Sequence, residues 1–273
     1  MKIVIAAIAD SHINGTVSLS LPSVNLDDGD TRQYSKCQRW LWQGWEDYWQ
    51  RVERAAKKAR LYVATVGDLG DLGVNGSTQV ITKNDTDIKK HITEILEPRV
   101  RKADRFFVIR GTEAHVGQSA KIEEAIANDL NAEKCPDTNT YSWYHLRAEW
   151  GGKLFDVAHH ASCSQLPWNK GSAASKLAAR IIFQCAENGR AKPDFVLRGH
   201  RHTYEDSFQT FSTRAILLPC WTFKNAYAHK VATNELPDIG GAIITIDGKT
   251  VHVEIVRYPL DSEVDVIWRE HKN

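Results

Sequence analysis

The amino-acid sequence predicts a mixed protein of the α+β / α/β kind, in which two sheets pack together with helices outside. Apolar runs without polar alternation indicate strands that are covered on both faces. In the first half of the chain such runs alternate with helix-like segments. The second half is rich in strand-like runs and contains the hairpin signals Gly151-Gly152 and Asp247-Gly248. No repeat, low-complexity run or linker divides the 273 residues, so we expect one domain over residues 1–273.

Local patterns predict each element in turn. Isoleucines three or four residues apart predict the helix at 85–100, and the spacing of Trp42, Trp45 and Trp49 places these rings on one face of a helix at 35–60. That face either packs in the core, or one of its rings borders the functional site and stacks on a base or aryl group of a ligand. The polar segment 13–34 is expected to be a long loop. In chain order the expected elements are strand 2–9, helix 35–60, strand 61–66, helix 85–100, strand 105–110, helix 121–130, strands 141–150 and 153–158, helix 172–188, strands 193–198 and 214–218, and the hairpin 242–246 and 250–258.

Five of the expected strands end in acidic or histidine residues. The carboxyl ends of the strands in an open α/β sheet line one crevice, so we expect these five ends to converge. Carboxylates combined with imidazoles suit Mn²⁺, Fe²⁺, Zn²⁺, Ni²⁺ or Co²⁺ better than Mg²⁺. The five ends are Asp10-Ser11-His12, Gly67-Asp68-Leu69-Gly70-Asp71, Gly111-Thr112-Glu113-Ala114-His115, His159-His160 and Gly199-His200-Arg201-His202.

This ordered set resembles the calcineurin-like metallophosphoesterase family. The family pattern reads Asp-x-His, Gly-Asp-x-x-Asp, Gly-Asn-His-Asp/Glu, a lone His and Gly-His-x-His. The third block departs from it, because Thr112 stands where the family has its metal-binding Asn. The variant Gly-Thr-Glu-Ala-His block and the Trp-rich segment before Asp68 look most like a phage-encoded branch. The resemblance implies a four-layer α/β/β/α sandwich of the metallophosphoesterase type.

The resemblance also implies a site with two divalent metal ions that hydrolyses a phosphodiester or phosphomonoester. A hydroxide held between the metals would attack phosphorus. Asp68 would bridge the ions, and of the pair His159-His160 we expect His159 to be the ligand, because it lies nearer the strand end. The implied ligands are Asp10, His12 and His202 on one metal, and His200 with His159 or His160 on the other.

The departure at Thr112 leaves two interpretations open. In one, Glu113 or Thr112 supplies the missing metal ligand and His115 protonates the leaving oxygen. In the other, the second metal is weakly held. Asp71 is expected to support the site rather than to bind metal.

A second class of function also stays open, namely a catalytically inactive metal-binding scaffold of the same fold that binds a protein or nucleic acid. Thr112 favours the scaffold, whereas the presence of every other matched ligand favours the enzyme. Trp168 and Trp221 follow site-forming ends and are expected either to line the pocket or to pack under loops.

Composition sets limits on partners and location. A net charge of +1 gives no global field for nucleic acid or an anionic membrane, although a nucleotide or nucleic acid stays among the candidate phosphate-ester substrates. The five cysteines lack paired C-x-x-C spacing, which favours free thiols in a reducing compartment. No secretory signal or membrane-length apolar run is visible. We therefore expect a cytoplasmic protein, in the host cytosol if the gene is viral, of unknown oligomeric state.

Overall fold

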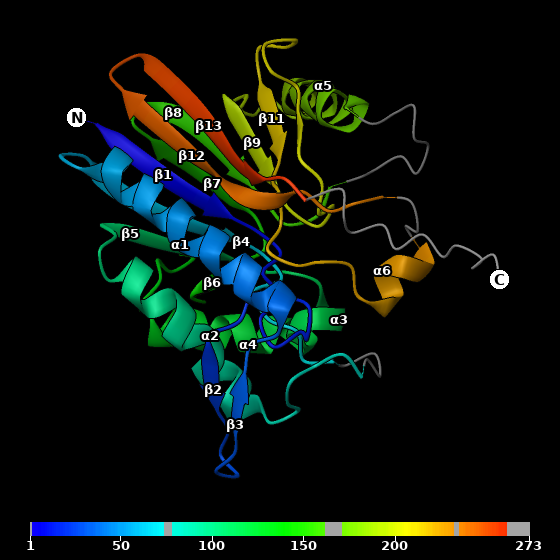
Figure 1. Cartoon of the computed structure of the whole chain (residues 1–273). Coiled ribbons are helices and arrows are strands. Elements are labelled where there is room, and N and C mark those ends of the chain that lie inside the picture. Colours follow the sequence, from blue (N-terminus) through cyan, green and yellow to red (C-terminus); the bar gives the residue numbers. More distant parts are fainter. Residues whose placement is uncertain (1, 74–77, 162–170, 232–234, 261–273) are drawn as a thin grey trace.

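Two central sheets pack face to face with helices on both outer sides, as a computed structural model of the chain shows (Figure 1). The structure describes residues 2–73, 78–161, 171–231 and 235–260. Three apolar clusters fill the three spaces between the layers: one lies under the helices of the first sheet, one between the sheets, and one under the helix of the second sheet. The expected four-layer α/β/β/α sandwich is therefore confirmed.

The first sheet contains four parallel strands flanked by an antiparallel hairpin. Its strand order is β13-β12-β1-β4-β5-β6, and β1, β4, β5 and β6 run in the same direction. Their carboxyl ends therefore lie at one edge of the sheet. The strands are β1 (Ile3–Ile8), β4 (Arg60–Val66), β5 (Arg105–Ile109), β6 (Ser142–Trp143), β12 (Ile239–Asp247) and β13 (Thr250–Tyr258).

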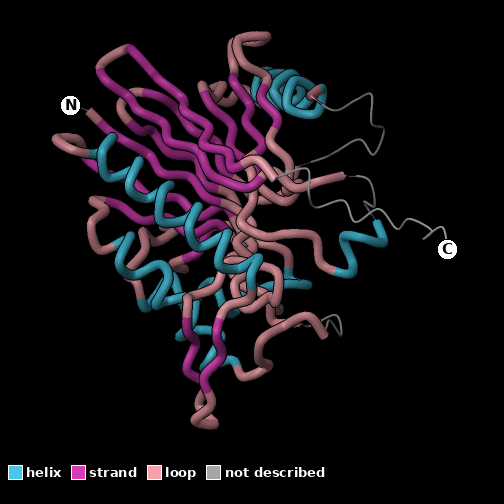
Figure 2. The backbone as a smooth tube through the Cα atoms, viewed as in Figure 1, coloured by secondary structure: helices cyan, strands magenta, loops and turns pink. Residues whose placement is uncertain are grey.

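The second sheet has the order β10-β11-β9-β8-β7, and its central strands β8, β9 and β11 are parallel. Figure 2 shows it stacked behind the first sheet. Its strands are β7 (Leu146–Trp150), β8 (Lys153–Val157), β9 (Phe195–Arg198), β10 (Glu205–Asp206) and β11 (Arg214–Leu217). The ends of β8 and β9 meet the carboxyl edge of the first sheet, since Gly199 donates a hydrogen bond to His159 and His200 donates to Asp10.

Helices α1 (Lys36–Ala56), α2 (Asp85–Val100) and α4 (Lys121–Asp129) cover the first sheet, and α5 (Ser172–Glu187) covers the second. Ser35 caps α1 in a capping box with Gln38, which satisfies amides at the start of the helix. Trp45 and Trp49 are fully buried in an aromatic cluster with Trp221. The core interpretation of the tryptophan face is thus confirmed for these rings.

Several expected boundaries were wrong. Helix α1 ends at Ala56, because the chain must turn before β4 begins at Arg60. The run 141–150 divides into β6 and β7, since β6 pairs with β5 whereas β7 pairs with β8 of the other sheet. The segment 13–34 contains the hairpin β2 (Ser23–Asn25) and β3 (Thr31–Gln33). Three short helices were not expected, namely α3 (Glu113–Val116), η1 (Gln118–Ala120) and α6 (Ala226–Val231). Among the described residues, no helix is both long and apolar enough to span a membrane.

Candidate metal centre

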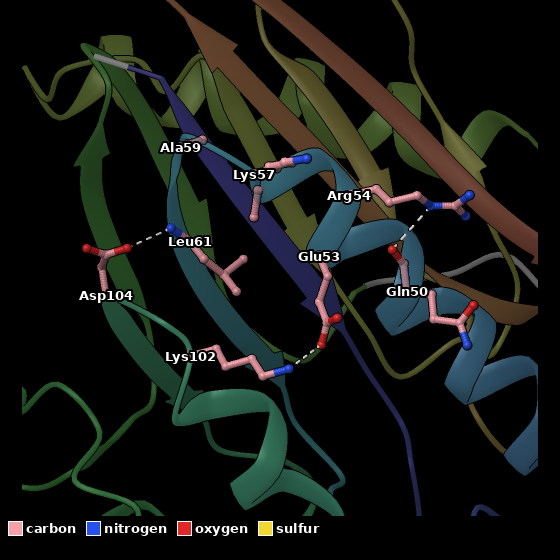
Figure 3. Close-up of a pocket in the computed structure, with 9 residues that line it drawn as sticks. Gln50, Glu53, Arg54, Lys57, Ala59, Leu61, Lys102 and Asp104 are labelled. Carbon is pink, nitrogen blue, oxygen red and sulfur yellow. Dashed lines mark hydrogen bonds and ion pairs between the residues drawn. The ribbon is translucent and has the colours of Figure 1, made fainter.

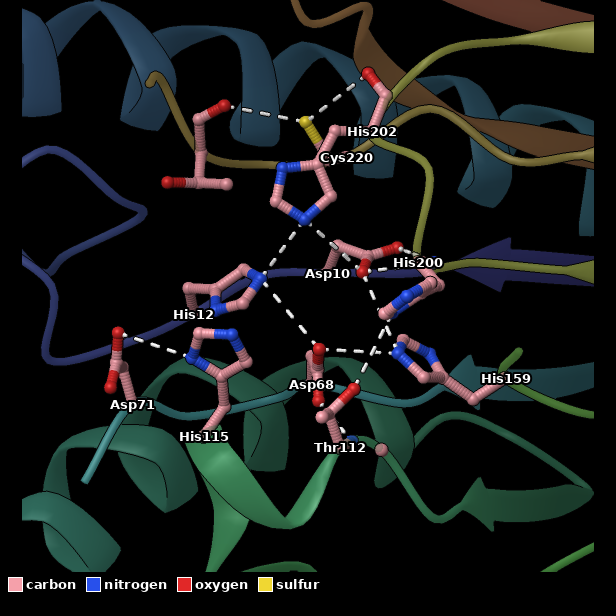
Figure 4. Close-up of polar contacts among 12 residues, drawn as sticks. Asp10, His12, Asp68, Asp71, Thr112, His115, His159, His200, His202 and Cys220 are labelled. Atoms are coloured by element: carbon pink, nitrogen blue, oxygen red, sulfur yellow. Dashed lines mark hydrogen bonds and ion pairs between the residues drawn. The ribbon is translucent and has the colours of Figure 1, made fainter. Parts of the chain in front are cut away.

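The side chains at the ends of β1, β4, β8 and β9 point toward one another at one edge of the sandwich (Figure 4). Four groups of three ligating residues have atoms within 4.8 Å of one another. Both sheets contribute, so the convergence depends on how the two sheets are stacked. The groups are Asp10-His12-His202, His12-Asp68-His115, Asp10-Asp68-His159 and His159-His160-His200.

Asp68 lies between the two sides of this cluster. Its Oδ1 accepts a 2.6 Å hydrogen bond from the amide of Thr112, which fixes the carboxylate. Its Oδ2 lies 3.1 Å from Nε2 of His159 and 3.9 Å from Nε2 of His12. Burial opposes the charged carboxylate, but the facing histidines hold the pKa of Asp68 well below its usual range. One carboxylate oxygen therefore faces ligands from both sides of the cluster.

His159 has one nitrogen assigned to the backbone and the other left for a ligand. Its Nδ1 lies 2.8 Å from the carbonyl oxygen of Val66, an acceptor, so Nδ1 carries the proton of a neutral ring. Its buried Nε2 faces Oδ2 of Asp68 at 3.1 Å, but no well-aligned hydrogen bond joins the two atoms. Burial opposes a charge on this ring, but Asp68 and Asp10 outweigh it and raise the pKa of His159 to about 10. A metal cation bound at Nε2 would be stabilised by the same two carboxylates.

His12 and His202 face each other with their Nε2 atoms 3.1 Å apart. Burial, and next the charge of His115, lower the pKa of His12 to about 3, so its ring is neutral at physiological pH. The carboxylate of Asp10 is fully buried beside them, with Oδ1 3.4 Å from Nε2 of His202. Two imidazoles and a carboxylate form a donor set that fits a borderline divalent cation.

Thr112, His160 and His200 form the outer side of the cluster. The hydroxyl oxygen of Thr112 lies 3.4 Å from Nε2 of His160 and 3.4 Å from Nδ1 of His200. Burial, and next the charge of His159, lower the pKa of His200 to about 4 and keep its nitrogen lone pairs available. Both members of the His159-His160 pair therefore reach the cluster, and Thr112 stands beside them.

Glu113 does not join the cluster. It is exposed at the first position of α3, and its Oε1 accepts a hydrogen bond of 3.0 Å from the amide of Ser119. The short helix directs this carboxylate to the following turn instead of the histidines, and none of the four ligand groups includes it. The expectation that Glu113 could supply a metal ligand therefore has no support in the geometry.

His115 and Asp71 lie at the opposite side of the cluster from His160. Nδ1 of His115 is 3.5 Å from Oδ2 of Asp71, whose Oδ1 accepts a hydrogen bond from the amide of Gly73. The His115 ring lies 4.5 Å from that of His12, centroid to centroid. Burial opposes its charge, but Asp71 and then Asp68 raise the pKa of His115. Asp71 is therefore the carboxylate that faces Nδ1 of His115.

The backbone at the cluster adopts a conformation that non-glycine residues rarely take. Left-handed φ angles cost free energy and persist where the surrounding structure imposes them, often at functional sites. Position 111 requires a glycine, because a Cβ atom there would overlap both the carboxylate and the amide of Asp68. Five candidate ligands have positive φ angles: Asp10 at 52°, His12 at 43°, Asp68 at 54°, His200 at 71° and His202 at 55°.

Sequence reasoning missed Glu123, which ties together two loops of the cluster. Its fully buried carboxylate accepts hydrogen bonds from the amide of Leu69 at 3.1 Å and from the amide of Gly111 at 2.6 Å. Burial, and next the charge of Asp68, raise the pKa of Glu123 to about 8. The only sequence signal was its position beside Ile122 on a helix that covers the sheet. Of the two tryptophans predicted to follow the site, Trp221 is fully buried in the core and Trp168 lies outside the described residues.

Comparisons with solved structures return proteins of low sequence identity to this chain. A dimetal phosphatase from Danio rerio has a TM-score of 0.48 and 7% identity, over 93% of this chain and 96% of that one. A predicted phosphoesterase from Streptococcus pneumoniae TIGR4 scores 0.42 with 10% identity, over 94% and 90%. Zinc-complexed Vps29 from Entamoeba histolytica scores 0.43 with 13% identity, over 93% and 98%. No protein-family profile and no curated protein matches the chain. At these scores the likenesses do not define an activity.

Proposed function

We propose that the chain is a dinuclear metal-dependent phosphoesterase of the calcineurin-like kind. The observation that carries the proposal is the position of Asp68 Oδ2 between ligand groups on its two sides. A bridging carboxylate suits two cations roughly 3.5–4 Å apart, the arrangement that clamps phosphoryl groups in in-line displacement. The mixture of imidazoles and carboxylates favours manganese, iron, zinc, nickel or cobalt.

The ligand atoms divide into two sets that share Asp68. Thr112 stands at the outer set in the place of an expected Asn, with its hydroxyl 3.4 Å from two imidazole nitrogens. We assign His160 to the outer set in addition to His159, because both lie within 4.8 Å of the His200 ligand atom. The proposed sets are Asp10, His12, Asp68 and His202 for the first ion, and Asp68, His159, His160 and His200 for the second.

Hydrolysis adds water across a phosphorus–oxygen bond, with the hydroxide going to phosphorus and the proton to the leaving oxygen. Bound ions of this kind polarise phosphoryl oxygens and lower the pKa of water. The chain positions the ligands for this task through the amides of Thr112 and His200, which hold the carboxylates of Asp68 and Asp10. We assign the proton donation to His115, whose protonated form the neighbouring Asp71 favours.

Titration of metal-free protein with Mn²⁺ tests the proposal. Metal content would be measured by elemental analysis, and hydrolysis with bis-p-nitrophenyl phosphate and p-nitrophenyl phosphate. We expect activity to appear with metal and to saturate near two ions per chain. Two bound ions without hydrolysis of either ester would favour the inactive scaffold, which the Thr112 departure also favours. A chain that binds neither ion would contradict both functions.

A further inference from the structure

The cleft over the metal ligands has two lobes that share one wall. The first, here the Arg201 lobe, has a volume of about 290 Å³ and is lined beyond the ligands by Arg201, Phe223, Lys224, Glu235 and Leu236, among others. The second, here the Gln79 lobe, has a volume of about 550 Å³ and is lined by Gly73, Thr78, Gln79 and Ala114, among others. The side chains common to both lobes are His115, His200, Asn225 and Tyr227.

The shared wall places both lobes at the reacting centre. His200 is a proposed ligand and His115 the proposed acid, so a phosphoryl group at the metals has space on two sides. Small-ligand sites occupy roughly 300–1,000 Å³, and the two lobes lie near or within that range. A phosphomonoester has one organic arm and would leave one lobe without a substrate group. A phosphodiester has two arms and can fill both.

The Arg201 lobe has donors for an oxygen-bearing arm. Arg201 lies between His200 and His202, and its Nε is buried without a hydrogen-bond partner among the described residues. Arg201 lines the lobe, and a guanidinium carries five N–H donors, so its outer N–H groups can donate to oxygen acceptors on a substrate arm. Phe223 and Leu236 add apolar surface to the same lobe, and Leu236 is 56% exposed.

Tyr227 supplies an aromatic face between the lobes. It belongs to the short helix α6, and it is 69% exposed although it lines both lobes. An exposed ring and an arginine that line the same lobe match an arm that has a flat ring and oxygen acceptors, as a nucleoside has.

We propose that the site acts on phosphodiesters that place one organic arm in each lobe, with Arg201 and Tyr227 binding a nucleoside-like arm. This inference rests on the phosphoesterase function proposed above. The reaction breaks one phosphorus–oxygen bond, adds hydroxide to phosphorus and a proton to the departing oxygen, and leaves the other arm attached to a phosphomonoester.

Two diesters with the same leaving group test the inference. Methyl p-nitrophenyl phosphate and the p-nitrophenyl ester of thymidine 5′-monophosphate differ only in the arm that is retained. We expect the Mn²⁺-loaded chain to show a kcat/KM about tenfold or more higher for the thymidine ester, the size of one charged hydrogen bond. Arg201→Ala and Tyr227→Ala should each reduce this ratio toward one, mainly through KM for the thymidine ester.

Matched surface variants serve as controls. Tyr144 is 67% exposed and lines neither lobe, and Arg190 is exposed beyond the end of α5, so Tyr144→Ala and Arg190→Ala should keep the wild-type ratio. Equal kcat/KM for the two diesters, or faster hydrolysis of p-nitrophenyl phosphate than of both, would overturn the two-arm inference and leave the phosphoesterase proposal standing. Failure to hydrolyse any of the three esters would instead reject the proposed function, and the inference with it.

Discussion

Two charged hollows formed by the described residues differ in how far their groups already have partners. The α1 hollow, lined among others by Glu53, Arg54, Lys102 and Asp104, has a volume of about 620 Å³ and exceeds either lobe of the metal cleft (Figure 3). Four of its charged side chains already have partners: Lys102 contacts Glu53 at 2.7 Å, Asp104 accepts from the Leu61 amide at 2.8 Å, and Arg54 donates to the Gln50 carbonyl.

The metal cleft differs from the α1 hollow in its chemistry, although each of its lobes is smaller. Its carboxylates and His159 are buried, its His12 and His200 are held neutral, and its His159 Nε2 faces Oδ2 of Asp68 without a well-aligned hydrogen bond. In the α1 hollow the Lys102 and Glu53 side chains are 61% and 42% exposed, so water can solvate them. Buried ligand atoms that converge from several strands therefore distinguish a candidate site better than volume does.

The largest expected difference between the two hollows comes from replacing one carboxylate in each. Asp68→Asn removes the charge that faces both ligand groups, so we expect hydrolysis to fall by several orders of magnitude and metal content to fall to one ion or none. Asp104→Asn keeps an oxygen that can accept from Leu61 and should leave both unchanged. Elemental analysis and bis-p-nitrophenyl phosphate hydrolysis measure the two effects. Full activity with two ions in Asp68→Asn would reject the bridge.

His115→Ala is expected to produce the next largest loss, and the loss should depend on the leaving group. General-acid catalysis is worth roughly 10²–10⁴-fold where the leaving oxygen needs a proton. Diesters with alkyl leaving groups should therefore slow by about that factor, while p-nitrophenyl diesters should slow little. Metal content should stay at the wild-type value.

The exposed His252 on β13 supplies the control, since His252→Ala removes a histidine away from the cleft. Its rates on both ester classes should match the wild-type rates. Equal slowing of both classes in His115→Ala, together with a loss of metal, would make His115 a ligand and remove its assignment as the acid.

A smaller effect is expected from Glu123, which fixes the loops without facing the cleft. Loss of groups that orient metal ligands commonly lowers metal affinity by about 10–100-fold, and we expect this of Glu123→Ala. Glu123→Gln retains one acceptor and should lose less. Glu124→Ala is a matched control, because that neighbour accepts from the amides of Tyr141 and Ser142 instead. Dissociation constants for Mn²⁺ distinguish these outcomes, and equal affinity in all three variants would deny Glu123 a positioning role.

The parts that sequence could predict are those that depend on local patterns. The runs that became β1 and β4 are apolar and end in Asp-bearing turns, so both the strands and the candidate ligands that follow could be located. Helix α2 matches its expected bounds of 85–100, although Pro98 lies inside it. The four-layer arrangement came from the family resemblance, because periodicity does not show how two sheets stack.

The parts that sequence could not predict depend on tertiary partners. The buried carboxylate of Glu123 accepts hydrogen bonds from two amides of other loops, and the sequence around Glu123 does not predict these contacts. Tyr227 lies on a six-residue helix with no regular apolar face, so its place in the wall of both lobes could not be foreseen. The orientation of the Glu113 side chain could not be foreseen either, because it depends on the short helix α3, and the sequence predicted a loop there.

The smallest expected effects compare Thr112 with Glu113 in the same loop. The Thr112 hydroxyl lies 3.4 Å from ligand atoms of His160 and His200, whereas the Glu113 carboxylate accepts from Ser119. Thr112→Ala should weaken binding of the second ion by a few-fold, since it removes one neutral oxygen near the outer set but keeps the backbone amide that holds Asp68. Thr112→Asn restores an oxygen donor and should bind at least as well as the wild type. Glu113→Ala should change neither the metal content, measured by Mn²⁺ titration, nor the rate of bis-p-nitrophenyl phosphate hydrolysis. If Glu113→Ala lost the second ion while Thr112→Ala kept it, the carboxylate would have to leave Ser119 and turn into the cleft when metal binds.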